Sequence, residues 1–140
     1  MPHQINRRGD VTELLLYDII GENLFGGISA EEVVSDLANI DTPTINVRIN
    51  SPGGSVWEGL VIHDALVRHE ARIEVDVDAL AASMGSVIAM TGDVIRVAPH
   101  ADLMIHNAWG ATAGDSRELR RYADLLDTKN RNIIDIYEAR

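Results

Sequence analysis

Twice along this chain, a strand-like segment runs through a turn of small residues into a helix-like segment. The two occurrences are strand 45–49, turn 50–54 and helix 55–67, and strand 73–77, turn 81–86 and a short apolar helix. The segment 73–77 alternates apolar and acidic residues, which is the period expected of a strand. Because strands that alternate with helices need crossover connections, and no hairpin signal is seen, the pattern predicts an α/β fold with mostly parallel strands.

The remaining segments continue the alternation. Glu13 to Ile20 is predicted to be a strand, and residues 29–32 read Ser-Ala-Glu-Glu, a capping box that opens a helix through about Asn39. Two further short strands are expected near 94–97 and 103–105. Since no linker, repeat or low-complexity segment interrupts the pattern, residues 1–140 are predicted to form a single domain.

Composition excludes several classes of protein. The net charge of −10 argues against nucleic acid as a partner, and the absence of cysteine excludes disulfides and a cysteine protease. No apolar run is long enough to span a bilayer, and residues 1–10 lack the apolar core of a signal peptide. No histidine cluster suggests a metal, so we expect a soluble protein without a metal or cofactor. The histidines interpreted as surface or packing residues are His3, His63, His69 and His100.

Ser83 lies in the turn 81–86, between the strand-like and helix-like segments. A turn of small residues in this position projects the hydroxyl outward, and the helix N-terminus behind it favours a developing oxyanion. This is the geometry that a nucleophilic serine needs. For an isolated serine, however, the alternative role as a helix cap is the commoner one.

Two other segments favour the catalytic interpretation. Gly53 and Gly54 let the backbone approach a ligand closely and expose amides, although Ser55 could instead cap an ordinary strand-to-helix turn. His106 follows the short apolar run 103–105. The glycine pair, Ser83 and His106 thus each follow a predicted strand, at the sheet edge where open α/β sheets place their sites.

These motifs together resemble the proteolytic subunit of the Clp serine protease. The matching stretches are Ile49–Val56 (INSPGGSV), Ala81–Ser86 (AASMGS) and Met104–His106 (MIH), in the family's order, and the match covers nearly the whole chain. Two stretches are more similar to the Clp-related head-maturation proteases of tailed phages and prophages; they are Leu14–Gly21 and Ile105–Gly110. One residue departs from the pattern, because Ala79 stands where the family usually has glycine.

The resemblance implies roles for the residues of the three motifs. Ser83 would be the nucleophile and His106 the general base, while the amides of Gly54 and Met84 would bind the oxyanion. Extended peptide would add a strand to the backbone beside the site. The residues expected to contact it are Gly53, Ser55, Val56 and Asn107. The implied fold is the crotonase-like spiral of β-β-α units.

The third member of a triad is not assigned. The family completes its triad with an aspartate well downstream of the histidine, and no aspartate of this chain matches that position. The expectation from the sequence is therefore that the chain is truncated after Arg140 or that the acid comes from elsewhere. A truncated form is expected to be a weak or inactive protease.

The last segment, residues 115–140, is predicted to be one helix capped by Asp115 or Ser116. Leu119, Tyr122, Leu126, Ile133 and Ile136 fall on one stripe of it, which is interrupted by Lys129. Pattern alone does not distinguish a helix that covers its own sheet from one that binds another subunit. The resemblance implies the second, a protruding handle helix through which two rings interdigitate.

We therefore expect a serine endopeptidase in a homo-oligomeric ring or double ring. It would act on protein or peptide substrates in the cytoplasm of a bacterium or a phage-infected host, with an unfoldase or a capsid protein as partner, or without ATP. One alternative is a ring-forming scaffold or assembly protein that keeps the fold without the chemistry. A second is acyl-CoA chemistry of the crotonase type, against which the order of serine and histidine argues.

Overall fold

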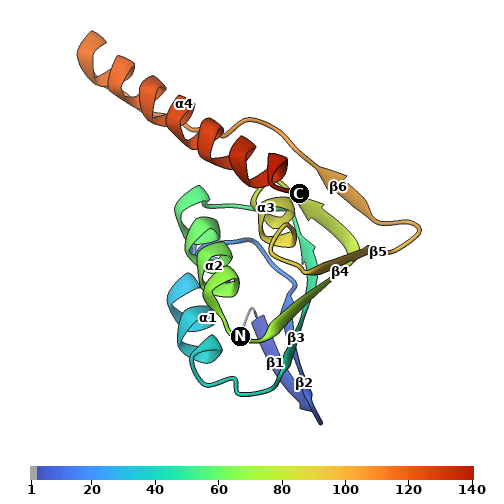
Figure 1. Cartoon of the computed structure of the whole chain (residues 1–140). Helices are drawn as coiled ribbons and strands as arrows, with labels where there is room; N and C mark the ends of the chain where they lie inside the picture. Colours follow the sequence, from blue (N-terminus) through green and yellow to red (C-terminus); the bar gives the residue numbers. More distant parts are fainter. Residues whose placement is uncertain (1–2) are drawn as a thin grey trace. The chain divides into compact units, whose positions relative to one another are not determined.

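The computed structural model describes residues 3–140, which divide into two compact units, residues 3–105 and 106–140 (Figure 1). The elements of the first unit are β1 (His3–Arg8), β2 (Val11–Leu16), α1 (Ala30–Leu37), β3 (Thr44–Ser51), α2 (Val56–Arg68), β4 (Arg72–Ala82), α3 (Met84–Ala89), β5 (Val94–Val97) and β6 (Asp102–Met104). The second unit contains α4 (Ser116–Glu138). The prediction of a mixed α/β fold with mostly parallel strands is confirmed.

The strands form one sheet in the order β1-β2-β3-β4-β5, and β6 pairs with the end of β4. All neighbouring pairs among the described strands are parallel except β1 and β2. That antiparallel pair corrects the expectation that the chain has no hairpin. The sequence feature that indicates this hairpin is the two-residue turn Gly9-Asp10. Gly9 has φ +64°, a conformation that glycine adopts readily.

The helix N-termini follow from local chemistry, as the sequence predicted. Ser29 caps α1 by accepting a hydrogen bond from the Glu32 N–H, and Ser55 caps α2 by accepting one from the Glu58 N–H. Two strand predictions had the wrong length. The chain leaves the sheet after Leu16, before the predicted end of that strand, and β4 runs on to Ala82.

The core lies on one face of the sheet, beneath α1 and α2 (Figure 1). Alternate residues of the central strands point to it, and each is at most 3% exposed: Leu14, Leu16, Ile45, Val47, Ile49, Ile73, Val75 and Val77. The helices contribute Val33 and Leu37 from α1 and Ile62 and Leu66 from α2. Burying one such side chain contributes about 1.5–3 kcal/mol, so this layer is a main source of the stability of the first unit.

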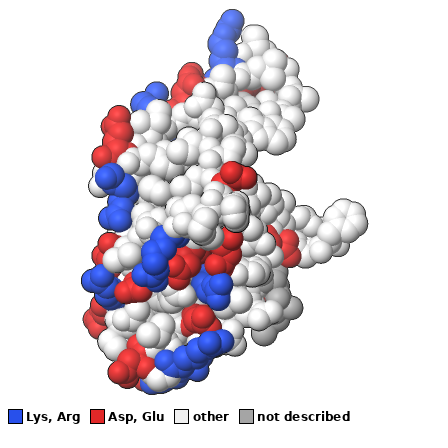
Figure 2. Space-filling model, turned by 90° about the vertical axis from the view of Figure 1, so that its right-hand side faces the viewer, with Lys and Arg blue, Asp and Glu red and all other residues white. Residues whose placement is uncertain are grey.

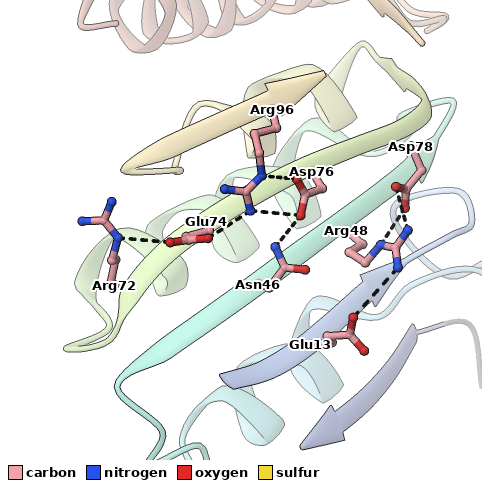
Figure 3. Close-up of polar contacts among 8 residues, drawn as sticks. All are labelled: Glu13, Asn46, Arg48, Arg72, Glu74, Asp76, Asp78 and Arg96. Carbon is pink, nitrogen blue, oxygen red and sulfur yellow. Dashed lines mark hydrogen bonds and ion pairs between the residues drawn. The ribbon is translucent and has the colours of Figure 1, made fainter. Parts of the chain in front are cut away.

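The opposite face of the sheet is polar, which is unusual for parallel strands because these are normally covered on both faces. Figure 3 shows side chains of β2 to β5 linked across this face. Arg96 Nε lies 2.6 Å from Asp76 Oδ1, Arg96 Nη2 lies 2.9 Å from Glu74 Oε2, and Asn46 donates to Asp76 at 2.6 Å. Figure 2 shows acidic and basic side chains intermingled on the surface, not separated by sign.

These contacts change the pKa values of the groups involved. Hydrogen bonds from Arg96 are the largest cause that lowers the pKa of both Asp76 and Glu74. Arg48 pairs with Asp78 at 2.9 Å, and this contact raises the pKa of the Arg48 guanidinium. Tyr17 donates a hydrogen bond to the same Asp78, and burial followed by this hydrogen bond raises the pKa of the Tyr17 hydroxyl. The carboxylates of this face are thus paired with arginine side chains.

The second unit consists of residues 106–115 and α4. Asp115 caps α4 through a capping box, accepting from the Glu118 N–H at 3.0 Å while the Glu118 side chain accepts from the Asp115 N–H. Ala108 N–H donates to Asn130 Oδ1 at 2.7 Å, so the preceding segment runs along the helix. Within residues 3–140, no helix is long and apolar enough to cross a membrane.

Candidate active site

Ser83 joins β4 to α3 in a strained backbone conformation. Its φ is +53° and its ψ −122°, and it is the one residue other than glycine with a positive φ among those described. Its side chain makes no capping hydrogen bond to α3, which removes the main alternative to a catalytic role. A serine costs about 1–3 kcal/mol in such a region, so the surrounding structure must impose it. Strained strand-to-helix turns of this kind present the nucleophilic serines of α/β-hydrolases.

The Ser83 carbonyl is bound from inside α3. It accepts hydrogen bonds from Ser86 Oγ at 2.6 Å, from the Ser86 N–H at 3.0 Å and from the Val87 N–H at 3.3 Å. Because the peptide group is planar and trans, the Met84 N–H points away from that carbonyl. The Met84 amide is therefore aimed out of the helix, at its N-terminus.

The turn at Gly53 and Gly54 lies directly against Ser83. A Cβ added at Gly53 would lie 2.7 Å from the Ser83 Cβ and 3.0 Å from the Met84 N, distances too short for any other residue to fit. Gly53 also has φ +89°, which favours glycine again. The glycine predicted from the sequence is thus required both by its conformation and by the approach of the two turns.

The Gly54 amide is oriented by the same planarity argument. The Gly53 carbonyl accepts a hydrogen bond from the Ile20 N–H at 2.8 Å, and the Ser55 N–H donates to the Ile20 carbonyl at 2.8 Å. The Gly54 N–H therefore points away from the Ile20 backbone. Ser51 supports this turn, because its Oγ accepts from the Gly53 N–H at 3.1 Å and donates to the Asp18 carbonyl at 2.7 Å.

The strand that leads to His106 passes beside Ser83. The register pairs Ala82 with Met104, and the Ser83 N–H donates to the Met104 carbonyl at 2.8 Å. His106 and Asn107 are exposed and begin the second unit. The structure therefore brings together six of the predicted site residues in the first unit, whereas His106, the predicted general base, and Asn107 belong to the second. The six are Gly53, Gly54, Ser55, Val56, Ser83 and Met84.

Three residues that shape this site were not singled out by sequence. Ser51 and Ser86 lie within motifs that the sequence analysis identified, but their residue types alone do not indicate that their hydroxyls bind the backbone. Ile20 lies at the end of a predicted strand and instead forms isolated bridges to Ile28 and Gly54. Among residues 3–140, no group of three or more histidine, cysteine, aspartate or glutamate side chains is arranged to bind a metal ion.

Comparison with known proteins gives a consistent result. The Clp protease family model matches residues 13–140. The ATP-dependent Clp protease proteolytic subunits of Streptococcus pyogenes serotype M5 (strain Manfredo) and serotype M49 (strain NZ131) are each 34% identical to the chain over 107 residues. Each match covers 75% of this chain and 54% of the relative, so the chain spans about half the length of the curated relatives it matches.

Proposed function

This chain belongs to the Clp protease family, and we propose that it contributes the nucleophile and oxyanion hole of a serine endopeptidase that cuts peptide bonds inside an oligomer. The observation that carries the proposal is the backbone of Ser83. A serine at φ +53° that caps no helix has no structural benefit to offset its strain. Its position between an oxyanion-type turn and a helix N-terminus supports a chemical role.

In the proposed reaction, Ser83 Oγ attacks a peptide carbonyl and His106 takes the hydroxyl proton, then gives it to the leaving amine. The path of the chain supports this pairing. Met104 accepts a hydrogen bond from the Ser83 N–H, and His106 follows two residues later. Two residues span at most about 7 Å, so the length of chain between Met104 and His106 limits how far their Cα atoms can separate.

The amides of Gly54 and Met84 would bind the oxyanion of the tetrahedral intermediate. Both belong to peptide groups whose carbonyls are already bound, by Ile20 for Gly53 and by α3 for Ser83. Such pre-oriented donors need no reorganisation as charge develops, and losing one typically costs about 100- to 1,000-fold in rate. Substrate would lie extended beside Gly53, Ser55, Val56 and Asn107.

Partners and setting complete the proposal. We place α4 as a handle through which copies of the chain form a ring or double ring. The motifs at 14–21 and 105–110 support a phage or prophage protease that matures capsid proteins in the host cytoplasm, with or without an ATP-driven unfoldase. The alternative is a scaffold with the same fold. It does not explain why a serine is kept in the strained conformation of Ser83.

Labelling with a fluorophosphonate tests the proposal, because this probe reacts with serines that are activated by a base. We expect one label per chain, located at Ser83 by peptide mass spectrometry. Ser83→Ala should remove it, and Ser35→Ala, an exposed serine of α1, should leave it unchanged. A parent protein that binds peptide and assembles but takes up no label would favour the scaffold.

A further inference from the structure

We propose that two buried hydroxyls, those of Ser51 and Ser86, are positioning residues for the oxyanion hole, one for each of its amides. The proposal rests on the function proposed above. Neither side chain faces the substrate, because Ser51 is 1% exposed and Ser86 is 0% exposed. Each acts on the backbone instead.

Ser86 acts on the Met84 amide. Its Oγ donates to the Ser83 carbonyl at 2.6 Å, the shortest of the three hydrogen bonds which that oxygen accepts. The oxygen belongs to the same rigid peptide group as the Met84 N–H, so a tilt of the carbonyl tilts the amide by the same angle. Because Ser83 is strained, the turn relaxes when a bond that restrains it is removed.

Ser51 acts on the Gly54 amide through Gly53. Its hydroxyl connects two backbone segments, since it donates to the Asp18 carbonyl at 2.7 Å and accepts from the Gly53 N–H at 3.1 Å. Gly53 and Gly54 both have positive φ, and glycine has the widest choice of alternative conformations. Without the hydroxyl, the turn keeps its bonds to Ile20 but loses the one bond from a side chain that fixes Gly53.

Packing gives a second reason to assign the hydroxyls to this task. The Ser51 carbonyl lies 3.2 Å from the position of a Cβ on Gly85, so the two turns are in close contact through their backbones. A displacement of either turn should therefore displace the other. The hydroxyls lie on the two sides of this contact and restrain both turns from within the protein.

The test measures kcat and KM separately for Ser51→Ala and Ser86→Ala. Complete loss of an oxyanion donor costs about 100- to 1,000-fold in kcat, and a displaced donor should cost less. We expect about a tenfold lower kcat for each variant with KM within twofold, because substrate contacts are unchanged. Binding of a peptide boronate, which places an oxygen in the hole, should weaken by a similar factor.

Thr12→Val is the matched control. Thr12 is 3% exposed and its hydroxyl lies 2.8 Å from that of Thr42, within the same unit but away from the motifs of the site. This variant also loses a buried hydroxyl and some stability, but its kcat should equal that of the parent. Serine variants whose kcat also equals that of the parent, or that change only KM, would overturn the proposal.

Amide hydrogen exchange gives a readout that does not need activity. We expect Ser51→Ala to speed exchange at Gly53, and Ser86→Ala to speed exchange at Ser86 and Val87, more than Thr12→Val does. An inactive, unlabelled parent would contradict the proposed function alone. Unchanged exchange at these amides would contradict the positioning role, whatever the activity.

Discussion

The two units of this chain are built in different ways. In residues 3–105, strands and helices bury a shared core, and every turn of the candidate site is bonded to another segment of that unit. In residues 106–140, the hydrogen bonds described above lie within the unit itself. They are the capping box of Asp115 and the bond from Ala108 N–H to Asn130. A helix of this kind gains most of its stability from packing on something else.

The difference teaches where the chemistry is vulnerable. The proposed nucleophile and both proposed oxyanion amides are fixed by the unit that contains the core cluster, whereas His106 and Asn107 belong to the unit in which Ile133 is the one buried residue among those described. If the proposed function is right, the order of the general base depends on what the second unit binds, and activity should be lost under milder conditions than the fold of the first unit.

The largest effect should come from Ser83→Ala. Removing the nucleophile of a serine protease lowers kcat by several orders of magnitude, and we expect a loss of at least about 1,000-fold in the hydrolysis of casein. The thermal midpoint should change little, because alanine keeps the Cβ and the hydroxyl caps nothing. Hydrolysis by the variant at the parental rate would contradict the nucleophile assignment.

The next effect should come from the double variant Leu126→Asp and Ile133→Asp on α4. Burial of Leu126 in an interface contributes about 1.5–3 kcal/mol, so charging it should weaken association by about 10-fold or more. Ile133 is 7% exposed and so is already buried within the chain, and charging it should also lower the stability of the subunit. Sedimentation should show a smaller species. Circular dichroism should show that the helices of the first unit remain folded. The control adds the same charges at Thr128 and Asn132, which are exposed. A double variant that sediments like the parent would mean that the stripe packs within its own subunit.

A smaller effect of opposite sign is expected for Ser83→Gly. Glycine adopts a positive φ without strain, which should raise the free energy of unfolding by about 1–3 kcal/mol. The greater conformational entropy of glycine in the unfolded chain should lower it by about 0.5–1 kcal/mol. The net gain of about 1 kcal/mol should raise the thermal midpoint by about 3 °C while activity is lost. Ser35→Gly, in the regular helix α1, should lower the midpoint instead. A lower midpoint for Ser83→Gly would contradict the strain.

The smallest effect concerns acid stability of the polar sheet face. The pKa values of Glu74 and Asp76 are lowered in the folded state, chiefly by Arg96, so their contribution is present above their unfolded pKa values of about 4 and is lost as pH falls below them. Arg96→Met should therefore lower the thermal midpoint at pH 7 more than at pH 3. Because exposed pairs are weak and screened by salt, the difference should shrink in 1 M salt. An equal loss at both pH values would point to packing by the arginine stem.

Local signals predicted much of the fold. Caps act within three residues, so Ser29, Ser55 and Asp115 could be recognised from their neighbours, and helix α1 begins where expected. The alternation of apolar residues is also a pattern among neighbouring residues, and it predicted the core strands. The sequence did not predict the hairpin of β1 and β2, because β1 is polar and lacks the alternation of apolar residues that indicates a strand.

What the sequence could not give depends on contacts between distant segments. The hydroxyl of Ser51 bonds to Asp18, 33 residues earlier, and nothing in either local pattern indicates that bond. The positive φ of Ser83 is likewise imposed by its surroundings, since serine itself does not favour it. The motifs identified which residues form the site, and the structure supplies what orients them.

The backbone of Ser83 also bears on how this sequence arose. Selection for thermal stability alone would favour glycine at a position with φ +53°, because a side chain there only adds cost. The proposed function accounts for the serine, because the proposed chemistry needs a hydroxyl there at the expense of the fold. In a descendant that kept the architecture and abandoned the chemistry, this is the first residue of the site that drift should replace.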